Sequence, residues 1–163
     1  MEEKTSKFLF NKYNRQQAEE ILSKEEFNRK TVSFYRYTMI ASPKELRDEL
    51  FISWSKLNVL GRIYLANEGI NAQLNVPEHN WDEFVENLYS YSFFKDVPFK
   101  FAVQEKGLGS FYKLTIKVRN QIVADGLSID DYDVTNVGNH LNASQWNKAM
   151  NEGAVVVDMR NHY

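Results

Sequence analysis

Residues 61–76, GRIYLANEGINAQLNV, decide the fold of this chain. Apolar and polar side chains alternate on both sides of a central Asn-Glu-Gly tripeptide, which is the pattern of two half-buried strands joined by a short hairpin loop. Gly69 can take the left-handed backbone conformation that such a loop needs. We therefore expect strands at 61–66 and 70–76, with Glu68 exposed at the hairpin tip.

Periodicity on either side of this hairpin predicts the other elements of the sheet. In chain order we expect a helix at 15–29, a strand at 31–40, a helix from 43 to 57, the hairpin, a helix at 80–91, and strands at 99–104 and 111–118. After the leading helix, this order is a βαββαβ unit with one added strand, the ferredoxin-like arrangement of the α+β class. Such a sheet carries both helices on one face and leaves its other face open.

The remainder of the chain differs in composition from this unit. We expect an N-terminal helical extension at 1–30, the ferredoxin-like domain at 31–119, a linker at 120–142 that lies across this domain, and a further unit at 143–163. In the last unit, 144–152 indicates a short helix, and the run Ala-Val-Val-Val at 154–157 is typical of a strand buried on both faces of a parallel sheet. One strand cannot form a sheet, so this unit is interpreted as the beginning of a truncated α/β domain.

Composition excludes several classes of function. The chain has 163 residues, of which 43% are hydrophobic, and it contains no cysteine, so it holds neither a disulfide nor a thiol nucleophile. No apolar run approaches the length of a membrane span, and the first residues lack the layout of a signal peptide, so we expect a cytoplasmic protein. The three histidines are isolated, so we expect no metal site. No phosphate-binding glycine motif is present either.

The open face of the expected sheet is the best candidate for a binding surface. Alternation places amides, basic groups and tyrosines on this face: Arg62, Tyr64, Asn71, Gln73, Lys113, Lys117 and Arg119, with Tyr35 and Tyr37 beside them. A surface of this kind can stack unpaired bases, hydrogen-bond their edges and neutralise phosphate. The alternative is a solvated face, or one covered by the leading helix or by another domain.

Five short motifs occur in order along the chain. They are FYRY at 34–37, LANEGINA at 65–72, KVR at 117–119 together with IVADG at 122–126, NVG at 136–138, and DMRNHY at 158–163. Together they resemble the bacterial tRNA uridine(34) hydroxylase family, also described as rhodanese-like. The resemblance runs from about Thr31 to the last residue.

The resemblance implies a fold and an activity for a longer parent protein. In the family, an acylphosphatase-like N-terminal domain precedes a rhodanese domain, and the enzyme uses dioxygen to install 5-hydroxyuridine at the wobble position of tRNA. The essential cysteine lies in the rhodanese loop, which would follow Tyr163. The resemblance thus implies that this chain has no catalytic residue or cofactor of its own and is inactive alone, with Asp158 and Arg160 in structural roles.

Three hypotheses follow for the chain itself. In the first, its open face positions the anticodon loop of tRNA, and the missing rhodanese domain is its partner. In the second, it is a structural docking domain of a rhodanese-type protein, without RNA contacts of its own. In the third, suggested by topology alone, it is an acylphosphatase-like hydrolase, although fold by itself does not carry function.

Overall fold

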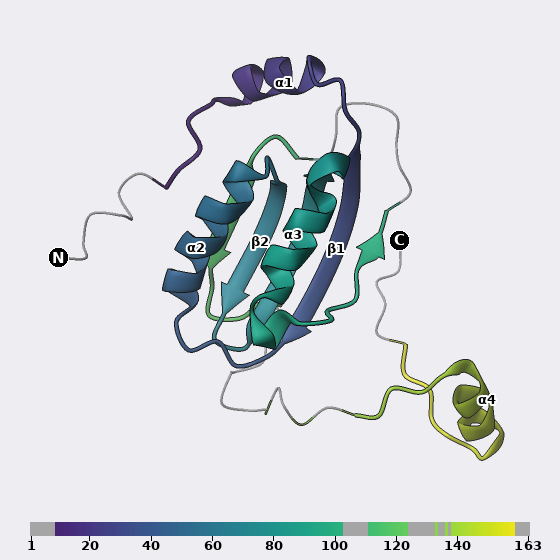
Figure 1. The fold of residues 1–163 in the computed structure, drawn as a ribbon. Coiled ribbons are helices and arrows are strands. Elements are labelled where there is room, and N and C mark those ends of the chain that lie inside the picture. The colour runs from purple at the N-terminus through teal and green to yellow at the C-terminus, as the bar shows by residue number, and fades with distance from the viewer. Residues whose placement is uncertain (1–8, 103–110, 124–132, 134–135, 137, 159–163) are drawn as a thin grey trace.

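The chain folds around one five-stranded sheet, as a computed structural model shows (Figure 1). The structure describes residues 9–102, 111–123, 133, 136 and 138–158. Its elements are α1 (Arg15–Ser23), β1 (Arg29–Tyr37), α2 (Pro43–Lys56), β2 (Leu60–Ala66), β3 (Gly69–Pro77), the 3-10 turn η2 (Glu78–Asn80), α3 (Trp81–Tyr89), the 3-10 turn η3 (Ser92–Phe94), β4 (Lys100–Phe101), β5 (Leu114–Val118) and α4 (Ala143–Asn151).

The topology confirms the predicted ferredoxin-like arrangement. The strands lie in the order β4-β1-β3-β2-β5. The pairs β1–β3, β1–β4 and β2–β3 are antiparallel, whereas the added strand β5 runs parallel to β2. Helices α2 and α3 lie side by side over one face of the sheet, and α1 lies beyond one end of it (Figure 1).

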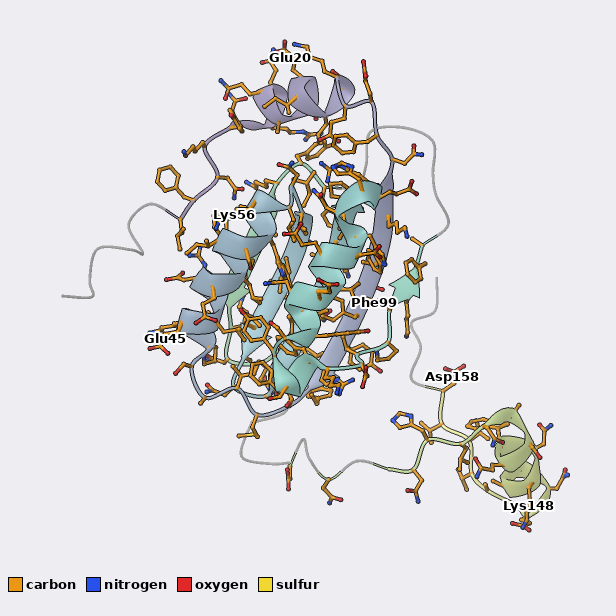
Figure 2. All side chains as sticks on the ribbon, viewed as in Figure 1. Glu20, Glu45, Lys56, Phe99, Lys148 and Asp158 are labelled. Atoms are coloured by element: carbon orange, nitrogen blue, oxygen red, sulfur yellow. The ribbon has the colours of Figure 1, made fainter. Side chains whose placement is uncertain are left out.

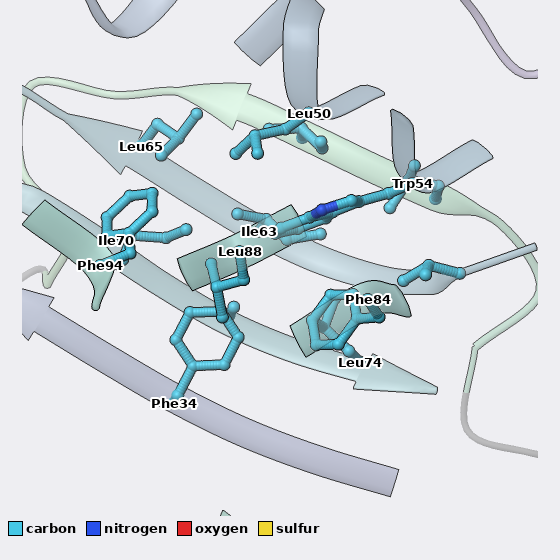
Figure 3. Close-up of a cluster of buried hydrophobic side chains, with 14 of the residues drawn as sticks. Phe34, Leu50, Trp54, Ile63, Leu65, Ile70, Leu74, Phe84, Leu88 and Phe94 are labelled. Carbon is cyan, nitrogen blue, oxygen red and sulfur yellow. The ribbon is translucent and has the colours of Figure 1, made fainter. Parts of the chain in front are cut away.

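The hydrophobic core lies between this helical layer and the sheet (Figure 3). Trp54 of α2 and Phe84 of α3 are fully buried, with ring centroids 5.2 Å apart, over Ile63 and Leu74 of the sheet. The indole Nε1 of Trp54 donates to Oδ1 of Asn87 at 3.0 Å, so its polar group remains paired inside the core. Because the alternate residues of each strand fill this core, the others are left on the opposite face.

Several boundaries differ from those predicted. Helix α1 ends at Ser23, not at residue 29; its last turn closes with bonds from the Lys24 N–H to the Ile21 carbonyl and from the Glu25 N–H to the Leu22 carbonyl. Strand β1 covers 29–37 instead of 31–40, since Arg29 pairs with Pro77 at the end of the long β3 strand. Of the strand predicted at 99–104, the described residues form a strand only at Lys100–Phe101, and β5 begins three residues later than predicted.

The valine-rich segment near the end is not a strand in this structure. Helix α4 confirms the helix predicted at 144–152 to within one residue at each end, but it has no buried side chain. Residues 154–157 follow as irregular backbone, with Val155 90% and Val157 72% exposed. A strand needs a neighbour to pair with, and within the described ranges this segment has none. The start of a second α/β domain is therefore not confirmed.

Among the residues that the structure describes, no helix combines the length and the apolar character needed to cross a bilayer.

Candidate nucleic-acid interface

Strand β3 organises the open face because it has a partner strand on each side. Asn71 lies opposite Tyr35 of β1 and Tyr64 of β2, and in the next row Gln73 lies opposite Arg62 of β2. Directly opposed residues share a face of the sheet. The two rows therefore carry polar and aromatic side chains away from the helical layer.

Strand β5 extends both rows on one side. Lys117 pairs in register with Tyr64, and Thr115 with Arg62. Lys113 and Arg119 flank the strand at the same alternation, so the sequence pattern assigns them to this face as well. The register thus places Arg62, Tyr64, Asn71, Gln73 and Lys117 on one face, and with Lys113 and Arg119 these predicted residues make up what we call the open face.

Two cations are held over tyrosine rings on this face. The guanidinium carbon of Arg119 lies 5.6 Å from the ring centroid of Tyr64. Near the opposite edge of the sheet, on the same face, Nζ of Lys100 lies 5.7 Å from the ring centroid of Tyr35, which is 53% exposed. Each contact contributes about 0.5–1 kcal/mol at an exposed site and restrains the cation above its ring.

Lys100 was missing from the seven predicted residues. It lies on the short edge strand β4, where Lys100 pairs with Ser33 of β1. The segment 99–123 has five basic residues and one acidic residue, a charge pattern that also fits blocks that pair across the surface. Its position beside Tyr35 depends on the pairing of β4 with β1, which composition does not reveal.

The positive charges of the open face are not neutralised within the described part of the chain. Arg62, Lys113, Lys117 and Arg119 are all exposed, and none of them forms an ion pair there. The whole chain has a net charge of −2, so this face is a local concentration of positive charge on a mildly acidic protein. Such a patch attracts a polyanion even where the net charge does not.

The expectation that Glu68 is exposed was wrong. Its side chain is only 3% exposed, and its Oε1 accepts a hydrogen bond from the backbone N–H of Ile122 at 2.7 Å. The chain after β5 returns to the hairpin tip, where Ile122 is also buried. Glu68 therefore fixes the start of the predicted linker against the sheet domain, while most of the linker lies outside the described residues.

This returning segment also engages one of the predicted site residues. Nδ2 of Asn71 donates to the carbonyl oxygen of Ile122 at 3.3 Å, and the Asn71 side chain is half-buried. Asn71 thus supports the returning backbone, whereas Gln73 in the next row is exposed. The accessible part of the open face is centred on the row of Gln73 and Arg62 and on the two tyrosine–cation pairs.

The described residues do not assemble a metal centre. Within these ranges, no three His, Asp or Glu side chains gather in a way that could hold a metal ion. His79 instead lies edge-on to Phe27, with ring centroids 4.8 Å apart. Asp158 lies in the exposed segment after α4, and Arg160 falls outside the described residues.

Comparison with known proteins places this sheet in a family. The family model described as UPF0176 acylphosphatase-like domain matches residues 29–122. A tRNA uridine(34) hydroxylase of Leptospira interrogans is 51% identical over 156 residues, which is 95% of this chain and 42% of that protein. Proteins with the same name from Escherichia fergusonii and Enterobacter sp. strain 638 are 47% and 41% identical, over 83% and 95% of this chain.

These relatives are considerably longer than the chain, which spans 42%, 39% and 45% of their respective lengths. The family match begins at the first residue of β1 and ends at Ile122, the residue that Glu68 binds. It therefore covers the sheet, its two helices and the returning segment, which together make up more than half of the 163 residues. On this evidence the chain belongs to the UPF0176 acylphosphatase-like domain family.

Proposed function

We propose that this chain is the N-terminal part of an enzyme that hydroxylates uridine 34 of tRNA to 5-hydroxyuridine, and that its open face positions the tRNA. Dioxygen is the co-substrate of the complete enzyme in this proposal. The name shared by the relatives supports the reaction. The observation that supports the positioning role is the set of exposed cations on one sheet face, which form no ion pair among the described residues and lie beside Tyr35 and Tyr64.

The chemistry of this face suits the unpaired nucleotides of an anticodon loop. Arg62, Lys117 and Arg119 can neutralise phosphates, and the fixed guanidinium plane of Arg119 also offers a surface for stacking. Tyr35 can stack an unpaired base, and the amide of Gln73 can donate to or accept from a base edge. Stacking on aromatic rings together with backbone neutralisation is the common mode of single-strand binding.

We assign the reacting groups to a part of the longer protein that this chain does not include. In the proposal, a rhodanese domain supplies the essential cysteine, since this chain has none. In this proposal, one domain holds the RNA and the other carries out the oxidation. The chain alone is expected to bind RNA without modifying it.

Binding of an anticodon stem-loop RNA by the 163-residue chain, measured by fluorescence anisotropy across a salt series, tests this proposal. The affinity should fall steeply with salt, and Lys117→Ala with Arg119→Ala should lower the slope of log affinity against log salt by roughly 1.4, about 0.7 per phosphate contact. The matched control, Lys44→Ala with Lys95→Ala, removes the same charge from exposed positions outside the open face and should leave both affinity and slope almost unchanged.

Two results would contradict the positioning role. One is the absence of binding at low salt, and the other is an equal loss in the control pair, which would indicate general attraction instead of a site. If the open-face variants changed the stability of the fold without changing the affinity for RNA, the chain would be a docking domain for the rest of the protein.

A further inference from the structure

A groove of about 520 Å³ lies between α1 with its preceding segment and the body of the domain. Its apolar floor combines Ala18 and Leu22 of α1, Phe51 of α2, Val59 and Leu114. Figure 1 shows α1 beyond the end of the sheet, and Figure 2 shows Lys56, the last residue of α2, at the end of α2 that lies toward α1. The volume falls in the range of sites that bind small organic groups.

The rim of the groove is positively charged. Four basic side chains and one acidic side chain line it: Lys12, Arg15, Arg29, Lys113 and Glu25. Glu25 is paired with Arg29 at 2.7 Å, and Arg15 is paired with Glu19 at 2.8 Å. Lys12 and Lys113 form no ion pair among the described residues. The groove therefore offers an apolar interior with free positive charge at its entrance, which suits an anion that carries a flat apolar group.

One wall of the groove is aromatic. The guanidinium carbon of Arg15 lies 5.0 Å from the ring centroid of Tyr112, and its Nη2 lies 3.4 Å from the Tyr112 hydroxyl oxygen. Tyr13, which is 60% exposed, also lines the groove. Guanidinium planes and tyrosine rings are the surfaces on which proteins stack nucleobases.

The groove and the row of basic residues along β5 share one residue. Lys113 lines the groove and also belongs to the row of basic residues that continues along β5 through Lys117 to Arg119. A phosphate bound at Lys113 would therefore lie at the junction of the two surfaces. Between Lys113 and Arg119 the chain has no acidic residue, so an RNA strand that follows β5 to the groove meets no acidic side chain of this segment.

We propose that this groove binds one unpaired nucleotide of the RNA that the open face holds, with its base on the wall of Tyr112 and Arg15 and its phosphates near Lys12 and Lys113. The inference rests on the proposed function, because the same RNA occupies both surfaces. It adds a second contact region, on the leading helix and outside the sheet, and it gives α1 a part in RNA binding.

Substitutions in the groove test this proposal with the same 163-residue chain and anticodon stem-loop RNA. Tyr112→Ala should weaken binding at least about fivefold, as expected for the loss of one stacked base, whereas Tyr112→Phe keeps the ring and should bind almost as the unmodified chain does. Lys12→Glu should weaken binding and lower the salt slope. Lys44→Glu makes the same charge change at the far end of α2 and is the matched control.

A second variant fills the groove without removing any of its RNA contacts. Ser55 is exposed on α2 and lines the groove, so Ser55→Trp should place an indole in the space of the base and lower affinity to a similar extent as Tyr112→Ala. A nucleotide in the groove also predicts photo-crosslinks from 4-thiouridine in the loop to peptides that contain Tyr13 or Tyr112.

The outcomes separate this inference from the proposed function. If open-face variants lose affinity while Tyr112→Ala, Lys12→Glu and Ser55→Trp bind normally and crosslinks occur only on the sheet, the groove is not an RNA site although the proposed function stands. If the unmodified chain binds no RNA at low salt, both ideas fail. Equal losses in Lys12→Glu and Lys44→Glu, with normal binding by Ser55→Trp, would also overturn the groove site.

Discussion

Gly69 begins β3 at a point where the backbone leaves no room for a side chain. Its φ is +147°, and a Cβ built there would lie 2.0 Å from the carbonyl oxygen of Arg36 on the paired strand β1. We expect Gly69→Ala to lower the free energy of unfolding by about 1–3 kcal/mol, measured by urea denaturation, because it adds both a strained conformation and a clash with backbone. Gly138→Ala is the control, since within the described residues no atom beyond its chain neighbours lies within 4 Å of its Cβ position. Equal effects of the two changes would contradict this account.

Glu68 ties two distant parts of the chain together through one buried carboxylate. Glu68→Ala leaves the buried N–H of Ile122 without this acceptor, and we expect a loss of about 1–3 kcal/mol in the free energy of unfolding. Glu68→Gln retains an amide oxygen that can accept the same bond, so its loss should be clearly smaller. Denaturation of the two variants side by side measures the difference, and equal losses would show that acceptance from Ile122 is not what stabilises the segment.

The same residue shows where inference from sequence stops. The alternation around Glu68 correctly predicted the hairpin, because the side chains within a strand follow a local period of two. Its burial depends on Ile122, which lies 54 positions away in the sequence. The contacts of Lys100 with Tyr35 and of Asn71 with Ile122 have the same origin, since they arise from the return of distant segments. The face of the candidate site was therefore predictable, whereas its internal hydrogen bonds were not.

At the scale of elements, Tyr91 links the end of α3 to α2. Its hydroxyl donates to Oε2 of Glu49 at 3.2 Å. Partial burial of the ring, followed by the nearby negative charge of Glu49 and this hydrogen bond, raises the pKa of Tyr91 to about 12 from its ordinary value of 10.0. Folding thus favours the neutral phenol, so this contribution to stability is complete below pH 10 and is lost as the pH rises through 12.

The raised pKa of Tyr91 can be tested by comparing the unmodified chain with Tyr91→Phe. We expect Tyr91→Phe to have a smaller fall in unfolding free energy between pH 10 and 12 than the unmodified chain, by at most about 1 kcal/mol because solvent screens the half-exposed pair. Comparing the two chains cancels the titration of lysines, which both share. A fall of the same size in both chains, or a larger one in Tyr91→Phe, would contradict the raised pKa.

The boundaries of elements illustrate a second limit of sequence patterns. The stripes of α2 and α3 and the alternation of β2 and β3 predicted each of these elements to within a few residues, because burial imposes the pattern. The start of β1 was misplaced by two residues, since it is set by the pairing of Arg29 with Pro77. Segment 154–157 was predicted as a strand from composition alone, but composition cannot supply the neighbouring strand that pairing requires.

For the whole molecule, the structure predicts that the residues after Gly138, which include α4, contribute nothing to the stability of the sheet domain. α4 buries no side chain, and Trp146 and Met150 are 50% and 45% exposed on it. A chain that ends at Gly138 should therefore have the same free energy of unfolding as the full chain, within about 0.5 kcal/mol by urea denaturation. It should also bind less of an apolar fluorescent dye, because the exposed apolar surface of α4 and the valines is gone.

A chain that ends at Arg119 provides the contrast, since it also loses Ile122 and the bond to Glu68. This shorter chain should be less stable by about 1–3 kcal/mol, the cost of leaving a buried polar group unpaired. If ending the chain at Gly138 costs as much as ending it at Arg119, α4 packs on the sheet domain, and the apolar surface that it exposes here is part of the core. If only the shorter chain is destabilised, the stable unit ends with the return of the chain to the hairpin tip, and α4 remains free to pack against another domain.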